Sequence, residues 1–203
     1  MGEGARKKKI MIKKSKVLMN EVAAINASTA VRFNCMTVLY ALQSFQAMSD
    51  KATELKTIRN RGEFWGRVQL SFRDQIVITT QKIFEKSDTY PQETFRELSE
   101  YATSRQIAFQ DISDSEKEFI ERVKQYRNKF VAHHERMENE QFISLVGDDF
   151  WSRAIVEIPK LMDKALSLCV SICAVYGIAL ETRPVHCGYK DTVRWMNLDQ
   201  NKN

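Results

Sequence analysis

The chain has 203 residues, of which 43% are hydrophobic, so it can bury a substantial core, and its 7 Gly and 3 Pro are too few for a turn-dense all-β protein. Its formal net charge is +5, yet the first 16 residues alone carry +6, which leaves the remaining 187 residues near −1. A wide basic surface therefore belongs to the tail, and the folded body would attract a nucleic acid only through a local patch.

The basic tail occupies residues 1–16, which we expect to be disordered. Its charge, and the brevity of the apolar run at 10–12, exclude a secretory signal, so a cytoplasmic location is expected. The longest uncharged run, residues 165–180, falls short of the roughly 20 apolar residues that a bilayer span needs. No membrane association is predicted.

The body of the chain predicts helices throughout, without the alternation of apolar and polar residues that would support a sheet. Residues 17–49 contain no Gly or Pro and carry an apolar stripe at helical spacing, although a break near 26–28 would divide them into two helices. Residues 64–84 repeat the stripe. A loop is expected at 87–91, and a short polar helix at 92–105 follows it.

The next predicted helix follows the polar segment 111–115. Ser115 and Glu118 predict a capping box at its start, because a serine followed three residues later by a glutamate can satisfy two amide groups of the first turn. The buried stripe of this helix is expected at Phe119, Val123, Tyr126 and Phe130. Arg127 lies beside this stripe, at the edge of a helix–helix groove.

The last long helix is predicted over residues 150–180, and Pro184 ends it because a proline disfavours helical geometry in the residue before it. Between the two helices, 137–147 is expected to be a loop with a short helical or extended piece. The sequence thus predicts an all-α bundle of about five to six helices over residues 17–182. A C-terminal extension, residues 183–203, shows little periodicity.

Four cysteines are present, and no two of them are spaced as C-x-x-C. Cys169 and Cys173 stand four residues apart in an apolar helix, where thiols pack as small hydrophobic side chains. We therefore expect structural thiols rather than disulfides or metal ligands, also at Cys35 and Cys187.

Residues 126–134 hold an arginine, an amide and two of the three histidines of the chain. Arg127 is a permanent cation that can bind a phosphate through two parallel hydrogen bonds. His133 and His134 can take and give protons near neutral pH. Because RNA carries its own nucleophile in the 2′-hydroxyl, these groups can cleave it without a metal, with Asn128 orienting the arginine or binding a phosphate oxygen.

Two other interpretations of these residues stay open. The arginine can be solvated, with the histidines favouring a helix C-terminus through its dipole. A metal site would draw on His133, His134, Glu135, His186 and Cys187. It is disfavoured because adjacent residues on a helix point about 100° apart and do not easily share one ion.

Residues 127–133, of sequence RNKFVAH, resemble the signature of the HEPN superfamily, an arginine followed by a polar residue and, a few positions on, a histidine near the end of a helix. The form is most similar to the abortive-infection branch. The resemblance covers about residues 20–182 and implies an up-down helical bundle. It also implies a dimeric, metal-independent endoribonuclease without a cofactor, often a toxin or anti-phage defence effector that cuts tRNA or other RNA, with an antitoxin or another defence-system protein as a partner.

Carried over on this motif, Arg127 is the phosphate clamp, Asn128 the positioning residue and His133 the general base or acid. The two motif helices of such a dimer form one composite cleft, so that each subunit supplies one of the two proton-transfer groups. Lys129, inside the motif, is expected to bind RNA. Asp74, on the preceding long helix, is the candidate for the acidic residue that often steadies the arginine in this family, and it also fits an ordinary surface carboxylate.

The two histidines compete for the proton-transfer role. On an undistorted helix His134 returns to within about 20° of Arg127, whereas His133 lies about 120° away. The family spacing favours His133, and a helix end or kink at 131–132 would reconcile the two. We assign His133, with His134 as a supporting or substitute base. The toxins that are silenced by adenylylation carry a tyrosine two positions after the histidine. This chain has Glu135 there when counted from His133 and Arg136 when counted from His134, so that regulation is not expected.

A catalytically inactive HEPN-like scaffold is the alternative function, because a fold does not fix a function. Such a scaffold would dimerise and bind nucleic acid or a protein partner. Lys7, Lys8 and Lys9 would then belong to a basic arm that binds phosphates, although the tail is equally explained as a solubilising segment.

Overall fold

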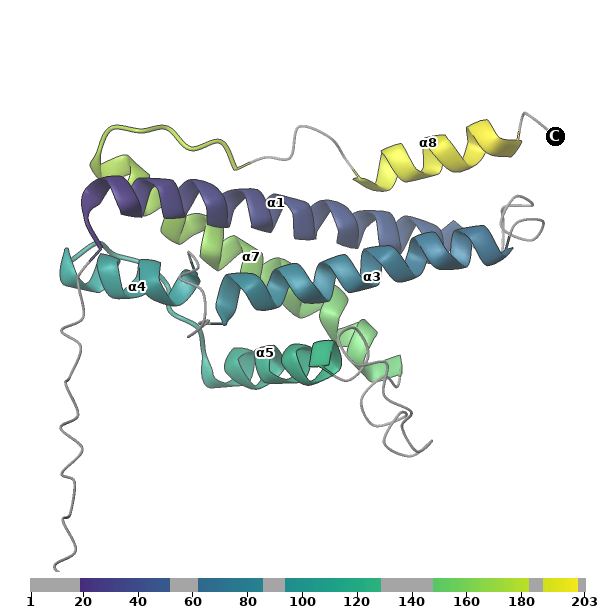
Figure 1. Cartoon of the computed structure of the whole chain (residues 1–203), viewed down its shortest axis with the longest axis horizontal. Helices are drawn as coiled ribbons and strands as arrows, with labels where there is room; N and C mark the ends of the chain where they lie inside the picture. Colours follow the sequence, from purple (N-terminus) through teal and green to yellow (C-terminus); the bar gives the residue numbers. More distant parts are fainter. Residues whose placement is uncertain (1–18, 52–61, 86–93, 129–147, 183–187, 201–203) are drawn as a thin grey trace, which may run out of the picture.

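The computed structural model describes residues 19–51, 62–85, 94–128, 148–182 and 188–200. This part contains six helices and no strand, which confirms the predicted all-α bundle. The helices are α1 (Glu21–Lys51), α3 (Gly62–Phe84), α4 (Phe95–Ser104), α5 (Asp114–Tyr126), α7 (Asp148–Val175) and α8 (Gly188–Gln200) (Figure 1). The basic tail with Lys7, Lys8 and Lys9, the expected loop at 87–91 and the segment 137–147 lie outside the described residues.

Helix α1 is the centre of the bundle and contacts α3, α7 and α8. Figure 1 shows α1 between α8 and α3, with α7 crossing behind. The break expected near 26–28 is wrong, because α1 runs through it. Ala27 and Ser28 are completely buried there, and this packing outweighs the weak helix propensity of Asn26 and Ser28. By length and composition Glu21–Asp50 could also cross a membrane, a test that the buried core helix of a soluble protein passes as well.

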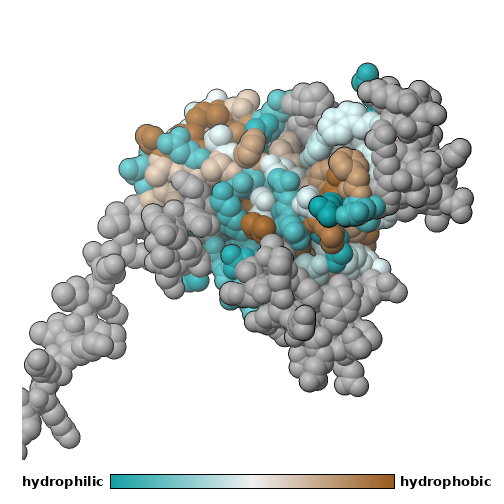
Figure 2. Space-filling view, turned by 45° about the vertical axis from the view of Figure 1, so that its right-hand side comes forward, coloured by the Kyte–Doolittle hydropathy of each residue, from teal (hydrophilic) through white to brown (hydrophobic). Residues whose placement is uncertain are grey.

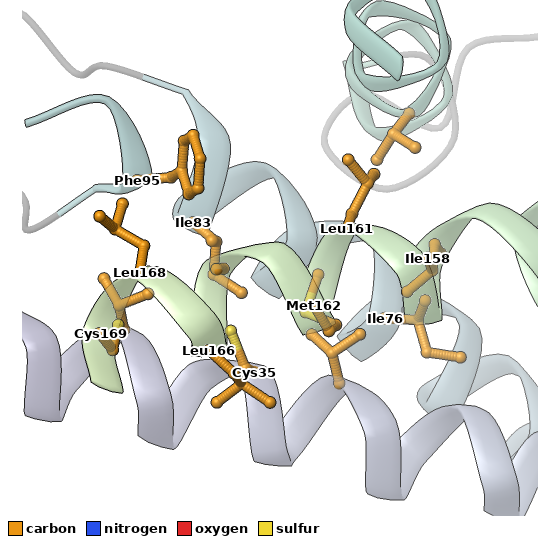
Figure 3. Packing of buried hydrophobic residues seen from close by; sticks show 14 of the residues in the cluster. Cys35, Ile76, Ile83, Phe95, Ile158, Leu161, Met162, Leu166, Leu168 and Cys169 are labelled. Carbon is orange, nitrogen blue, oxygen red and sulfur yellow. The ribbon is translucent and has the colours of Figure 1, made fainter. Parts of the chain in front are cut away.

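Five of the described helices, α1, α3, α4, α5 and α7, share the main core. Figure 3 shows Cys35 of α1 and Met162 of α7 packed in one cluster with Ile76 and Ile83 of α3 and with Phe95 of α4. Burying one large apolar side chain stabilises a fold by roughly 1.5–3 kcal/mol. This shared cluster therefore fixes the five helices relative to one another.

Three of the four cysteines lie in this core, as predicted. Cys35, Cys169 and Cys173 are free and buried, and Cys187 lies outside the described residues. Burial raises the pKa of all three thiols. They therefore stay protonated and pack as small apolar groups.

A capping box begins α5, but the predicted pair of residues is wrong. Ser113 Oγ accepts a hydrogen bond from the amide of Glu116 at 3.3 Å, and the Glu116 carboxylate accepts one from the amide of Ser113 at 2.7 Å. Ser113 and Ser115 both stand three residues before a glutamate, so the sequence pattern fits either pair. Lys164 of α7 decides between them, because its ammonium group lies 2.6 Å from the Glu116 carboxylate and holds it at a buried position.

Two helix ends also differ from the predicted ones. Thr94 caps α4, so this helix begins later than residue 92. Helix α7 ends before Gly177 rather than near residue 180. Gly177 adopts a φ of +69°, and the amide of Ile178 donates to the carbonyl of Cys173 at 3.0 Å, which closes a Schellman motif. A glycine thus ends the helix upstream of the proline that the sequence pattern favoured.

The C-terminal extension forms α8, although its sequence shows little periodicity, and this helix packs on α1. Its first residue, Gly188, donates to Gln43 Oε1 at 3.0 Å and accepts from Ser44 Oγ at 3.3 Å. Farther along, Met196 is completely buried against α1 and α3. The lack of a side chain at residue 188 lets the two helices approach this closely.

The substitution Gly188→Ala is expected to release α8 from α1. The added Cβ would lie 2.5 Å from the carbonyl oxygen of Tyr40 and 2.9 Å from Ser44 Oγ, so one backbone must move. We expect a lower melting temperature and faster amide hydrogen exchange along α8. Gly66→Ala in α3 is the matched control, because a Cβ there meets nothing within 4 Å. The control should stabilise the protein by roughly 0.5–1 kcal/mol, and equal behaviour of the two variants would contradict the close approach.

The ion pair of Glu116 and Lys164 predicts a pH dependence of stability. Burial by itself raises the pKa of Glu116, but hydrogen bonds from Lys164 and Ser113 outweigh it and hold this pKa below its ordinary value of 4.5. A lowered folded-state pKa stabilises the fold above the unfolded pKa, and this contribution is lost as the pH falls through the folded one. Glu116→Gln should therefore lose about 3–5 kcal/mol of unfolding free energy at pH 7. In urea titrations, the difference from wild type should shrink below about pH 4, whereas a constant difference would refute the ion pair.

Candidate functional site

The end of α5 is built around the side chain of Tyr126. Its ring stacks on Phe150 of α7, with centroids 4.9 Å apart and planes 4° from parallel. It also meets the edge of Trp151 at 5.7 Å. Phe119, two stripe positions earlier on α5, has its ring centroid 6.1 Å from that of Phe150. The predicted stripe is thus confirmed at Phe119, Val123 and Tyr126, which are all buried, while Phe130 lies outside the described residues.

Arg73 of α3 completes this aromatic cluster, and the sequence did not predict Arg73 as a residue of the site. Its guanidinium carbon lies 4.8 Å from the ring centroid of Trp151 and 5.7 Å from that of Tyr126. Its Nη2 atom donates a short hydrogen bond to the hydroxyl of Tyr126. The helical period did carry a signal for it, since Arg73 stands three and four residues before the buried Ile76 and Val77 and so falls on the buried face of α3.

Arg127 and Asn128 follow α5 directly and form a π-helical turn. The Nη1 atom of Arg127 donates to Asn128 Oδ1 at 2.9 Å, and both side chains are half-buried. Within the described part of the chain, Asn128 is the one hydrogen-bond partner of the Arg127 side chain. Its amide is neutral, so it orients the guanidinium and leaves its positive charge in place.

The π-helical turn changes the geometry on which the choice of histidine depends. In such a turn hydrogen bonds span five residues instead of four, so each residue advances by less than the 100° of an α-helix. Residues 127 and 128 are thus π-helical, upstream of the kink that the sequence suggested at 131–132, although the Arg127 backbone keeps α-helical φ and ψ of −57° and −48°. His133 and His134 lie outside the described residues, as does Lys129, so the choice between the two histidines stays a prediction.

Asp74 is half-buried on α3, next to Arg73 in the sequence. Burial raises the pKa of the Tyr126 phenol, the Arg73 charge opposes this rise, and the Asp74 charge adds to it. Asp74 thus lies near the end of α5 where Arg127 begins. Its expected role of steadying Arg127 stays a prediction.

The arrangement provides one part of the chemistry that RNA cleavage requires. A guanidinium held by a neutral partner can present its fork of N–H groups to a phosphate. Among the described residues, no group of three His, Cys, Asp or Glu side chains could hold a metal ion. The ligands considered for a metal, His133, His134, Glu135, His186 and Cys187, lie outside this part.

A separate groove of about 420 Å³ lies where α3, α4 and α5 meet. Its lining includes Glu85, Arg96 and Lys124. Lys124 lies 3.1 Å from Glu85, so the charges of these two residues already satisfy each other. This groove therefore offers less to a charged ligand than the end of α5 does.

Comparisons with known proteins were made for the family, for curated relatives and for the fold. No family model matches the chain, no curated protein matches it, and no solved structure matches it.

Phe150 is expected to be essential for the order of the site. It is 1% exposed and stacks on two rings of α5, so Phe150→Ala should lower the unfolding free energy by about 3–5 kcal/mol and weaken the aromatic signal in near-ultraviolet circular dichroism. Phe33→Ala is the control, because Phe33 is 68% exposed, and it should change stability by less than about 0.5 kcal/mol. Equal losses in the two variants would argue against the stacked cluster.

Proposed function

We propose that this chain is a metal-independent endoribonuclease that acts as a homodimer, and that it serves as a toxin or an anti-phage defence effector. The resemblance of residues 127–133 to the HEPN signature suggests this activity. The all-α bundle, in which Arg127 and Asn128 directly follow the helix α5, is compatible with it. The cellular role rests on the resemblance alone.

The observation that carries the proposal is the state of Arg127. An arginine that only stabilises a fold is commonly neutralised by a carboxylate or solvated, whereas Arg127 is half-buried and donates to the neutral amide of Asn128. The pair lies in a π-helical turn, and such turns occur frequently at functional sites. Among the described residues, this oriented cation has no carboxylate partner. A cation of this kind is what a phosphodiester in its transition state requires.

The proposed reaction uses the nucleophile that RNA itself contains. His133 of one subunit takes the proton of the 2′-hydroxyl, whose oxygen then attacks the adjacent phosphorus. The bond from phosphorus to the 5′-oxygen breaks, and a histidine of the second subunit protonates that oxygen. Arg127 binds the charge that develops on the phosphoryl oxygens. The products are a 2′,3′-cyclic phosphate and a 5′-hydroxyl.

The test incubates the purified protein with tRNA and with total RNA in the presence of a chelator. We expect cleavage that leaves 2′,3′-cyclic phosphate ends. Arg127→Ala should lower the rate by about 10²–10³-fold and His133→Ala by about 10²–10⁴-fold, because the first removes a charge clamp and the second a proton-transfer group. His134→Ala, measured beside them, decides which histidine acts. Arg67→Ala is the matched control, since Arg67 is exposed and pairs with Glu63 on α3.

Three outcomes would reject parts of this proposal. Loss of activity in chelator would refute the metal-independent mechanism. Binding of RNA by all variants without any cleavage would support the scaffold in place of the enzyme. A monomer in sedimentation at concentrations that retain full activity would refute the composite site. Growth arrest on expression, relieved by Arg127→Ala, is expected of a toxin and not of a scaffold.

A further inference from the structure

Arg73 is a half-buried cation, with a buried Nε atom, that the proposed cleavage reaction does not use. Its guanidinium lies against the rings of Trp151 and Tyr126 and donates to the Tyr126 hydroxyl. Within the described part of the chain, no carboxylate forms an ion pair with it. An apolar side chain would fill the same space without the desolvation of a charge. Departures of this kind from simple core packing concentrate at functional sites.

We propose that Arg73 is a positioning residue for RNA cleavage, which holds Tyr126 and thereby fixes the direction in which Arg127 and Asn128 leave α5. This inference rests on the proposed function. It assigns to α3 a part in the site that the motif by itself does not contain.

The aromatic contacts of Tyr126 do not by themselves fix the lateral position of its ring. Tyr126 is the last residue of α5, and its ring lies flat on Phe150. Stacked rings prefer an offset arrangement, but this preference is worth only about 0.5–1.5 kcal/mol, so small lateral shifts of the rings cost little. The hydrogen bond from Arg73 to the phenol oxygen is directional and prevents these shifts. The backbone of Tyr126, from which the π-helical turn continues, is thereby fixed.

The same geometry shows why Arg73 is a positioning residue and not a catalytic one. Its Nε atom is buried and has no hydrogen-bond partner among the described residues. Its Nη2 atom is engaged by Tyr126, and two aromatic rings lie within 6 Å of the guanidinium carbon. Arg73 therefore acts through Tyr126, while Arg127 is the cation that meets the phosphate.

Arg73→Met and Tyr126→Phe test the proposal, together with the double variant. Methionine keeps a long apolar side chain against the rings and removes the charge, whereas phenylalanine keeps the stacked ring and removes only the hydroxyl. Each single variant should lower kcat by roughly 10–100-fold with KM changed by less than about 3-fold, because misplacement of a catalytic group by about 1 Å has effects of this size. The double variant should lose no more than the worse single variant. Arg67→Met, on the exposed face of α3, should leave both parameters unchanged.

A second readout does not depend on activity. Arg73→Met should speed amide hydrogen exchange of residues 123–128 by at least about 10-fold and leave α4 as in wild type, because the end of α5 becomes free to move. If wild-type protein cleaves no RNA, the proposed function fails, and this measurement still decides whether Arg73 orders the turn.

Several results would overturn the inference. These are additive losses in the double variant, a rise in KM at constant kcat, or unchanged exchange at 123–128 in Arg73→Met. A loss of kcat that follows the melting temperature across all variants would show a role in stability alone. A fall in kcat at equal or higher melting temperature is the result expected of a positioning residue.

Discussion

The burial of α1 is the constraint on which the rest of the structure depends. This helix contacts α3, α7 and α8, and its inward face contributes Val31, Cys35, Val38 and Leu42 to the main core. The ring of Phe45, on the same helix, lies 5.1 Å from that of Trp151. Since Trp151 packs against Arg73 and Tyr126, the core and the candidate site share one continuous set of contacts. The packing of α1 and the end of α5 thus meet at Trp151.

Helix α5 is short, and both of its ends are held by charged side chains of other helices. At its start, Lys164 of α7 lies 2.6 Å from the capping residue Glu116. At its end, Arg73 of α3 donates to the hydroxyl of Tyr126. Apolar contacts hold a helix against its neighbours but do not fix its rotation or its position along its axis. Hydrogen bonds to charged groups are more directional, so they fix both. Because both ends of α5 are held, the side chains of the turn that follows it have a defined direction. A preorganised site generally requires side chains with a defined direction.

The sequence predicted the helical class and the order of the long helices well, because apolar residues at helical spacing recur through them. The sequence predicted helix starts and ends less well where two local signals competed. Ser113 and Ser115 each precede a glutamate by three residues, and only the distant Lys164 selects the first pair. Gly177 ended α7 before Pro184 was reached, and α8 formed from a segment with little periodicity because Gly188 allows a close approach to α1.

For the candidate site, the sequence by itself determined which groups can be proposed for the chemistry, since the types and spacing of Arg127, Asn128 and the two histidines follow from the chain alone. Only the tertiary structure decided that a cation of α3 lies against the last residue of α5. The reason is that Arg73, 53 residues before Tyr126, meets it through packing that no local pattern encodes. The hydrogen bond from Arg127 to Asn128 and the π-helical turn were likewise seen only in the folded chain, where they directly follow the end of α5 that Phe150 and Trp151 contact.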